Sequence, residues 1–302
     1  MIDRACISLN HRCNLHCKYC HFAGKESDIP DAEYELAPSE AEKIVDNIAQ
    51  YCSTYRVEKF KLGIVGSGEP LLSFATLIRI VESIDEVGNG VIKAYTISNG
   101  TCLTKEMADF FYRNRRLIDL SFSLDGDKPV HTALRQGFYR TMRAIDMYES
   151  FFHCKPLINA TVTRHTITHA DETIAFFLNN GFSQVNFSIV TDINDPTITI
   201  TKAEYEDFLN KCQTSGIVMR QRRNDLEKVY DCAKYGRLCG VGHTNVFFTK
   251  QGVFPCGRFF GLPEYKLGEY DAPLRDIEAQ FTNLNPIANG ECYFDKYVRQ
   301  TK

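Results

Sequence analysis

Residues 5–20 read ACISLNHRCNLHCKYC, an apolar run followed at once by three cysteines, Cys13, Cys17 and Cys20. The run ACISLN predicts a β-strand at about residues 5–10. The cysteines, three and two residues apart, place three thiolates in one short loop after that strand. Thiolates are soft ligands that favour zinc and iron–sulfur clusters. The stretch therefore predicts a metal site on the loop that follows the first strand.

Two kinds of metal are compatible with three cysteines. Iron–sulfur cubes contain four irons and are normally held by four cysteine thiolates, so a three-cysteine loop leaves one iron open for chemistry. A structural zinc site is instead closed by four ligands. His11, His16 or His21 would then have to supply the fourth ligand.

Composition predicts an ordinary globular protein. The chain has 302 residues, of which 44% are hydrophobic and 24% charged, enough to bury the core of one large domain and a small one. The net charge of -3 gives no basic field for nucleic acid. No apolar run approaches the ~20 residues of a membrane span, and no signal-type segment precedes the cysteines. We therefore expect a cytoplasmic protein without a nucleic-acid or membrane partner, whose twelve cysteines serve metal binding or catalysis rather than disulfides.

Apolar runs alternate with amphipathic helical patterns along most of the chain, which is typical of βα units that build a parallel sheet. The predicted strands lie at about 5–10, 58–65, 91–98, 117–124, 157–163 and 184–190. The predicted helices lie near 39–53, 73–87, 104–114, 138–150, 168–180 and 201–213. Ser39 with Glu40 is expected to open the first helix, Thr104 to open the third, and Gly181 to follow the end of the fifth.

The cysteine spacing, with Tyr19 just before the third cysteine, resembles the signature of the radical S-adenosylmethionine (SAM) superfamily. The resemblance implies a partial (β/α)6 TIM-like barrel and a 4Fe–4S cluster whose open iron binds SAM. It also implies reductive cleavage of SAM to a 5'-deoxyadenosyl radical that abstracts hydrogen from a substrate. An external one-electron reductant of the flavodoxin or ferredoxin type would drive this cleavage. In barrels of this type the active site lies at the C-terminal ends of the strands.

Several motifs follow the predicted strands. Gly66-Ser67-Gly68-Glu69-Pro70 resembles the family's GGEP turn, in which the backbone approaches a ligand closely and the glutamate contacts the SAM amine. Ser67 departs from the family pattern, because a glycine is usual there. The resemblance extends to SAM-contacting roles for a set of residues at other strand ends: Tyr19, Ser98, Asn99, Ser123, Asp125, Arg164 and Ile189.

These roles have simpler alternatives. Asn99 and Asp125 are also typical of Asx-turns that cap loops. Arg164 could grip the SAM carboxylate with its planar fork, or be a surface residue. Ile189 matches a position that packs on adenine, or is plain core. The stretch SLDGDKPVHTALR (123–135) closely resembles radical SAM maturases that carry auxiliary clusters, which favours the functional role of Ser123.

A second cysteine set surrounds the pattern TNVFFTKQGVFPC (244–256), which predicts a β-hairpin. Its members are Cys232, Cys239, Cys256 and Cys292. The region resembles the twitch form of the SPASM/twitch extension, which implies one auxiliary 4Fe–4S cluster held by all four cysteines and two clusters in total. We therefore expect a barrel at 1–215 and an auxiliary-cluster domain at 216–302. A structural zinc knuckle is the alternative.

The resemblance favours an enzyme that modifies a ribosomally made precursor peptide by oxidative cross-linking, dehydrogenation or epimerisation. A closed auxiliary cluster would accept the electron left on the substrate. The alternatives are a small-molecule dehydrogenase or epimerase of the aminocyclitol or sugar type, and a zinc protein without redox chemistry. No catalytic residue is assigned, although Cys154 and Cys212 are possible hydrogen donors for an epimerase. His131, Arg135 and His243 are candidates for ordering the site.

Overall fold

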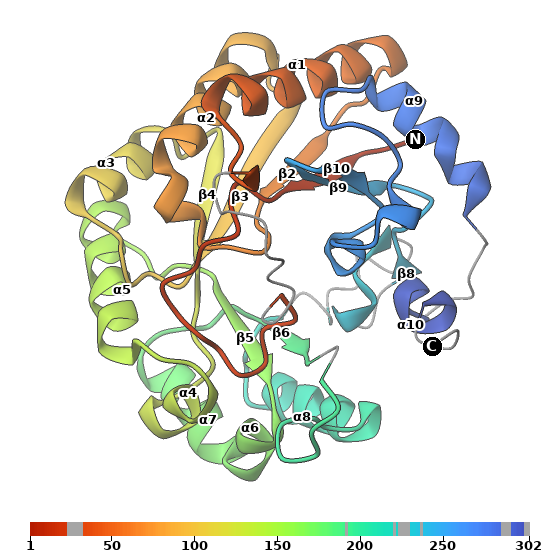
Figure 1. Ribbon diagram of the computed structural model, residues 1–302. Coiled ribbons are helices and arrows are strands. Elements are labelled where there is room, and N and C mark those ends of the chain that lie inside the picture. The colour runs from red at the N-terminus through yellow and green to blue at the C-terminus, as the bar shows by residue number, and fades with distance from the viewer. Residues whose placement is uncertain are drawn as a thin grey trace.

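The fold is a curved, mostly parallel sheet with its helices on the outside (Figure 1). The structure is a computed structural model, and it describes residues 1–22, 33–190, 193–219, 222, 230–235, 238–284 and 291–298. The main sheet has the strand order β10-β9-β1-β2-β3-β4-β5-β6. Every neighbouring pair in it is parallel except β9 and β10.

All six predicted barrel strands are present. The strands of the main sheet are β1 (Arg4–Ile7), β2 (Phe60–Ile64), β3 (Ile92–Ser98), β4 (Ile118–Ser123), β5 (Ile158–Val162), β6 (Val185–Ile189), β9 (Asn245–Thr249) and β10 (Gly252–Phe254). The last two form the predicted hairpin. A separate pair consists of β7 (Tyr230–Asp231) and β8 (Leu238–Cys239).

The six predicted helices are also confirmed, within about two residues at most ends. The α-helices are α1 (Pro38–Tyr55), α2 (Phe74–Val87), α3 (Lys105–Arg113), α4 (Lys128–Leu134), α5 (Phe138–Phe152), α6 (Arg164–Thr168), α7 (Ala170–Asn179), α8 (Lys202–Thr214), α9 (Leu274–Ala279) and α10 (Tyr293–Tyr297). The 3-10 helices are η2 (Pro70–Ser73), η5 (Ala233–Tyr235), η6 (Gly257–Phe259), η7 (Pro263–Tyr265) and η8 (Gln280–Asn283). Helices α4, α6, α9 and α10 lie outside the six predicted ranges.

The helix starts follow ordinary capping chemistry. Thr104 caps α3 as predicted, accepting a hydrogen bond from the Met107 N–H at 3.3 Å. Helix α1 begins earlier than predicted: Ala37 is its N-cap, Pro38 occupies the first turn, and the Glu40 carboxylate accepts from the Ala37 N–H at 2.8 Å. Glu40, which was expected together with Ser39 at the start of this helix, therefore provides the cap.

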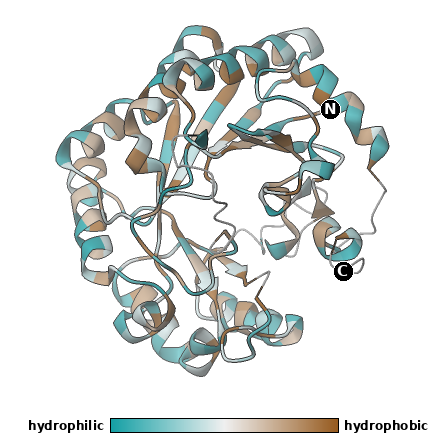
Figure 2. Cartoon of the chain, viewed as in Figure 1, coloured by the Kyte–Doolittle hydropathy of each residue, from teal (hydrophilic) through white to brown (hydrophobic). Residues whose placement is uncertain are grey.

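The barrel strands have one apolar and one polar face. In β5, Ile158, Ala160 and Val162 are almost completely buried, whereas Asn159 and Thr161 between them are only partly buried. Because successive strand residues point to opposite faces, the apolar set packs under the outer helices and the polar set lines the inside of the curve. Figure 2 shows hydrophobic and hydrophilic residues interspersed along the strands and helices.

Polar groups of four neighbouring strands are linked by hydrogen bonds: three side chains and one backbone carbonyl. Asn186 Nδ2 on β6 donates to Asn159 Oδ1 on β5 at 3.3 Å, and Asn159 Nδ2 donates to Ser121 Oγ on β4 at 3.0 Å. The Ser121 hydroxyl donates to the Thr96 carbonyl on β3 at 3.0 Å. A carbonyl can only accept, so the direction of every bond in this row is fixed. We call the three side chains, together with the Thr96 carbonyl, the polar row.

The C-terminal hairpin extends the barrel sheet. Strand β9 pairs in parallel with β1, from Arg4 opposite Asn245 to Ile7 opposite Phe248. Helix α9 lies beside α1 (Figure 1), where the Tyr51 hydroxyl donates to Glu278 Oε2 at 2.7 Å. The first strand is therefore interior to the sheet. Among the described residues, no helix is long and apolar enough to cross a membrane.

Candidate active site

The glycine turn after β2 is pressed against the segment that follows β1. A Cβ at Gly68 would lie 1.7 Å from Asn10 Oδ1 and 2.6 Å from the Arg12 carbonyl oxygen, so only glycine fits there. The Glu69 N–H donates to the same Arg12 carbonyl at 2.8 Å. The turn and the cysteine loop are thus held together by backbone contact.

Ser67, the departure from the family pattern, turns its side chain toward β1. Its hydroxyl lies 2.9 Å from Ser8 Oγ and donates to the Asn10 carbonyl at 3.0 Å. The Ser67 N–H also donates to Ser8 Oγ at 3.0 Å. The hydroxyl therefore adds to the contact between turn and strand.

Glu69 joins the ends of β2 and β3. Its side chain is buried, with Oε1 accepting from the Leu71 N–H at 3.1 Å and the Ser98 hydroxyl at 2.8 Å. Oε2 accepts from the Asn99 N–H at 2.8 Å. Burial raises the pKa of this carboxyl, and the three hydrogen bonds oppose the rise because they favour the ionised form.

Asn99 connects the end of β3 to the cysteine loop. Its Oδ1 accepts from the Thr101 N–H at 2.8 Å, which is the Asx-turn given above as the alternative. Its Nδ2 donates to Asn14 Oδ1 at 2.9 Å and lies 3.9 Å from Cys13 Sγ. The turn and the approach to the cysteine loop are therefore both present in one residue.

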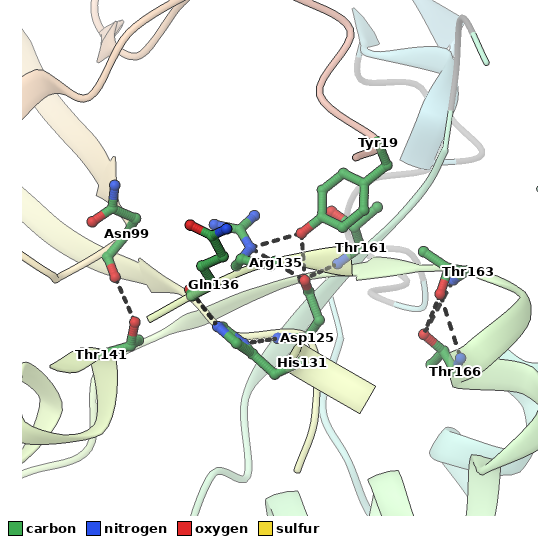
Figure 3. Close-up of polar contacts among 10 residues, drawn as sticks. All are labelled: Tyr19, Asn99, Asp125, His131, Arg135, Gln136, Thr141, Thr161, Thr163 and Thr166. Atoms are coloured by element: carbon green, nitrogen blue, oxygen red, sulfur yellow. Dashed lines mark hydrogen bonds and ion pairs between the residues drawn. The ribbon is translucent and has the colours of Figure 1, made fainter. Parts of the chain in front are cut away.

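Asp125, at the end of β4, lies at the centre of a buried polar cluster with Tyr19 and Arg135 (Figure 3). Asp125 Oδ2 accepts from the Tyr19 hydroxyl and from Arg135 Nε at 3.2 Å, and Oδ1 accepts from the Thr161 N–H at 2.9 Å. Arg135 Nε is also 2.7 Å from the Tyr19 oxygen. Burial raises the pKa of Tyr19 well above its ordinary value, which keeps the phenol neutral. The guanidinium compensates the buried carboxylate, and Tyr19 ties the cysteine loop to β4.

His131 on α4 orders the loop that carries Asp125. Its ring is fully buried, with Nδ1 3.4 Å from the Asp125 N–H and Nε2 3.3 Å from the Gln136 carbonyl (Figure 3). Both contacts are satisfied by the neutral tautomer with its proton on Nε2. Burial lowers the pKa of His131, which favours that neutral form. His131 is therefore a positioning residue for the cluster of Figure 3.

The three cysteines of the N-terminal loop are neighbours. Cys13 is exposed, and Cys17 and Cys20 are partly buried. Burial raises the pKa of Cys17 to about 11; Arg135 opposes the rise, and the nearby thiols of Cys13 and Cys20 add to it. Within the described ranges, no three His, Cys, Asp or Glu side chains surround a point for a single metal ion. Three neighbouring thiols beside a cation are a donor set that fits an iron–sulfur cluster, whose thiolates bind separate irons.

The second cysteine set gathers around the hairpin. Cys239 ends β8, Cys256 follows β10 and Cys292 precedes α10, and with Phe259 and Tyr293 they belong to one apolar cluster. Burial raises the pKa of all three thiols, and the charges of the other cysteines of the set, including the exposed Cys232, contribute to the rise for Cys256. Four thiols from separate segments are thus close enough to affect one another's ionisation. This donor set fits a closed cluster.

Arg164 is already paired. Its guanidinium binds the Glu204 carboxylate of α8 through Nη1 and, at 3.1 Å, Nη2, and Nη2 donates to the Thr199 carbonyl at 3.2 Å. Ser123 and Ile189 end β4 and β6 and are partly exposed. Their contacts with SAM stay predictions.

The possible hydrogen donors lie elsewhere. Cys154 is exposed just after α5, ahead of β5, and Cys212 is completely buried near the end of α8. In a βα barrel these positions belong to the N-terminal ends of the strands, opposite the motifs above. His243 stacks on Tyr230, with ring centroids 4.4 Å apart. The placement of these residues gives a hydrogen-donor or site-ordering role no support.

The sequence alone did not single out Asn10 and Asn14, which flank the first cysteine. Asn10 Nδ2 donates to the Glu69 carbonyl at 3.2 Å and to Ser73 Oγ at 2.7 Å. Asn14 bridges Asn99 and Thr101. Their position near the first cysteine of the signature is the one signal that could have identified them.

A parallel partial barrel with a three-cysteine loop after its first strand defines an enzyme class in which a cluster loop faces the carboxyl ends of the strands. The family model of the radical SAM superfamily matches residues 7–158, and the chain belongs to that superfamily. Membership of the family gives SAM and a 4Fe–4S cluster as the cofactors of this enzyme.

Relatives and solved structures extend the likeness beyond the matched half. The chain is 25% identical over 286 residues to a cysteine-type anaerobic sulfatase-maturating enzyme of Clostridium novyi, covering 85% of this chain and 73% of that relative. It shares its fold with native anSMEcpe bound to AdoMet and the Kp18Cys peptide, with a TM-score of 0.76, 18% identity and coverage of 93% and 83%. Streptococcus suis SuiB bound to its precursor peptide SuiA matches with a TM-score of 0.67, 16% identity and coverage of 92% and 64%.

Proposed function

We propose that this radical SAM enzyme oxidatively modifies a peptide and holds two 4Fe–4S clusters. The observation that carries the proposal is the second set of four neighbouring thiols, which surrounds a hairpin hydrogen-bonded to the first strand of the barrel. Cleavage of SAM requires only the first cluster. A second cluster with all its irons ligated by cysteine therefore favours a further electron-transfer step. One apolar cluster, which includes Phe22, lies next to both cysteine sets. Cys20 of the first set packs against this cluster. Gly257, which follows Cys256 of the second set, is so close to it that a Cβ there would lie 3.2 Å from Phe22 Cζ.

In this proposal the residues of the strand ends bind and orient SAM. Cys13, Cys17 and Cys20 hold the first cluster, and SAM bound there supplies the radical that abstracts hydrogen. Glu69 is fixed by donors on β3 and by its own turn, so its charge is held in place for the SAM ammonium group. Arg164 would have to exchange Glu204 for the SAM carboxylate.

The auxiliary unit, which we assign to residues 216–302, takes the electron. Removal of a hydrogen atom leaves one unpaired electron on the substrate. A dehydrogenation is complete only when the substrate radical also loses that electron and a proton. A cross-link likewise requires the loss of one electron and one proton as the new bond forms. Cys232, Cys239, Cys256 and Cys292 would hold the acceptor of this electron. A flavodoxin- or ferredoxin-type protein would, in its reduced form, supply the electron for SAM cleavage and, in its oxidised form, take up the electron of the auxiliary cluster.

A peptide substrate is supported by the fold. The structures of anSMEcpe and SuiB that share this fold over more than nine-tenths of the chain each hold a peptide. The polar row lines the inside of the barrel with groups that hydrogen-bond, which suits amides. A small-molecule dehydrogenase or epimerase remains the alternative for the same site.

Iron and sulfide quantitation with EPR tests the two-cluster proposal. The anaerobically reconstituted protein should bind about eight irons, and its Cys13/Cys17/Cys20 triple alanine variant about four. SAM should perturb the EPR signal of the wild type but not that of the triple variant. A Cys256/Cys292 double alanine variant is the matched control and should keep the SAM-sensitive signal. About four irons in the wild type and none in the triple variant would remove the auxiliary cluster and the oxidative role.

The substrate class requires a second measurement. The loaded enzyme, incubated with a synthetic peptide library, should yield products lighter by two hydrogens in mass spectra. Products of unchanged mass but inverted configuration would indicate an epimerase. Unchanged inversion in C154A and C212A would then agree with the position of both cysteines away from the strand-end motifs. Turnover with aminocyclitols but with no peptide would favour the small-molecule alternative.

A further inference from the structure

A buried arginine contacts a sulfur of the second cysteine set. Arg258 lies in η6, two residues after Cys256, and its side chain is only 9% exposed. Its Nη1 donates to Cys292 Sγ at 2.7 Å. The residue thus links the segment of one proposed ligand to the sulfur of another, and the two segments are far apart in sequence.

Asp295 and Phe294 hold the guanidinium in place. Arg258 Nη2 is 2.7 Å from Asp295 Oδ1, and Nη1 is 3.1 Å from Oδ2, which is a bidentate pair. The guanidinium carbon lies 4.4 Å from the centre of the Phe294 ring. Both partners belong to α10, which begins directly after Cys292.

The positive charge is less screened than the negative one. The Asp295 side chain is 44% exposed, so water screens its carboxylate, whereas Arg258 is enclosed. Arg258 Nη1 lies 2.7 Å from Cys292 Sγ, so the charge of the guanidinium acts directly at that sulfur. Charges and hydrogen bonds at cluster sulfurs are among the factors that set a cluster's reduction potential.

We propose that Arg258 is a positioning residue that raises the reduction potential of the auxiliary cluster by donating to Cys292 Sγ. Reduction adds one electron and hence one negative charge to the cluster. A fixed cation at 2.7 Å from a ligand sulfur stabilises that reduced state. The inference rests on the proposed function, because it requires the four cysteines to hold a cluster. It explains how the auxiliary site becomes an acceptor for a substrate electron.

The experiment uses the Cys13/Cys17/Cys20 triple alanine variant as parent, so that only the auxiliary cluster is observed. Each further variant is reconstituted anaerobically and its midpoint potential is measured by EPR-monitored redox titration. R258Q should make the equilibrium constant for reduction at least tenfold less favourable, which for one electron is about 59 mV. D295N removes a negative charge from the same site and should shift the potential the opposite way, by less because of screening. R275Q, which removes an exposed arginine paired with Asp276, should leave the potential unchanged.

The outcomes separate the two proposals. Opposite shifts in R258Q and D295N support the electrostatic role, because a merely structural role would not reverse sign with the charge removed. If R258Q fails to retain iron, R258K and D295N decide the question: R258K keeps the charge and should lie close to the parent, while D295N should still raise the potential. Shifts in one direction, or none in iron-replete variants, overturn the inference. A parent without iron overturns the proposed auxiliary cluster itself.

Discussion

At the scale of single residues, the site depends on side chains whose partners are far away in sequence. Tyr19, Asp125 and Arg135 form one buried cluster although Tyr19 and Asp125 are 106 positions apart. The sequence alone placed Tyr19 and Asp125 near SAM and Arg135 near the site, because Tyr19 lies within the cysteine signature and the other two lie in the stretch at residues 123–135. Nothing in their local sequence could reveal that they bind each other. That pairing depends on the packing of the whole barrel.

Gly68 is the most restrictive position of the turn. In G68A the new Cβ would meet Asn10 Oδ1 and the Arg12 carbonyl, so the turn must shift and Glu69 must leave its donors on β3. We expect SAM affinity to fall at least tenfold, or about 1.4 kcal/mol, in isothermal titration calorimetry. S67A, which loses only hydroxyl contacts, is the control. An unchanged Kd for G68A would mean that this turn does not bind SAM.

His131 predicts a pH dependence of stability. Its pKa is lowered in the folded protein, so the unfolded chain takes up the proton first. Its stabilising contribution is therefore present above the ordinary pKa of 6.5 and is lost as the pH falls through the folded pKa. In H131N the asparagine oxygen can replace Nδ1 as the acceptor for the Asp125 N–H, but the contact of Nε2 with the Gln136 carbonyl is lost, at a cost of about 1 kcal/mol. Because asparagine does not take up a proton, the variant should lose less stability than the wild type when the pH falls. Urea unfolding of the cluster-free protein above and below pH 6.5 checks this; equal pH slopes would contradict it.

At the scale of elements, periodicity and capping account for most of what could be predicted. Strands such as β5 alternate apolar and polar residues, and Thr104 is a recognisable cap. Helices α4 and α6 were missed because they are seven and five residues long, too short for a helical period to stand out. Helix α4 also begins with Asp127 as its cap and Pro129 in its first turn, a combination equally typical of a turn.

The ion pair between α6 and α8 is testable by NMR. Hydrogen bonds from Arg164 lower the pKa of Glu204 to about 2. The pair therefore stabilises the fold above the ordinary pKa of 4.5, and this contribution is lost as the pH falls toward about 2. In R164Q the Glu204 carboxyl should titrate at clearly higher pH in carbon-detected spectra. SAM should have the same effect in the wild type if Arg164 exchanges its partner, whereas a Glu204 pKa that SAM leaves unmoved would argue against the exchange.

At the scale of the whole molecule, the hairpin makes the C-terminal region part of the barrel sheet. The sequence pattern predicted the hairpin and its four cysteines, because both are local features. It did not predict that β9 would pair with β1, because parallel pairing between strands at opposite ends of a chain leaves no local signal. The proposed domain boundary at residue 215 therefore does not separate two sheets, because strands from both sides of it belong to the main sheet.

Phe248 offers a test of this joint. It is almost fully buried at the register position opposite Ile7, and F248A should destabilise the protein by about 3–5 kcal/mol. Hydrogen exchange should then quicken together in peptides covering β1 and the hairpin, because the two are one cooperative unit. F187A, which removes the same side-chain atoms from a buried position on β6, is the matched control for general destabilisation. Faster exchange confined to the hairpin would show that it unfolds as a separate unit.

The polar row has a consequence for what the lumen of the barrel admits. The hydrogen bonds of Ser121, Asn159 and Asn186 are fixed in one direction by the Thr96 carbonyl, so the remaining donors and acceptors of these side chains are oriented by the row itself. A purely hydrocarbon guest would strip water from these groups without replacing its hydrogen bonds, at about 1–3 kcal/mol for each group left unsatisfied. We therefore expect the inner wall of the barrel to favour polar guests, which can replace the hydrogen bonds of water, over hydrocarbon guests, which cannot.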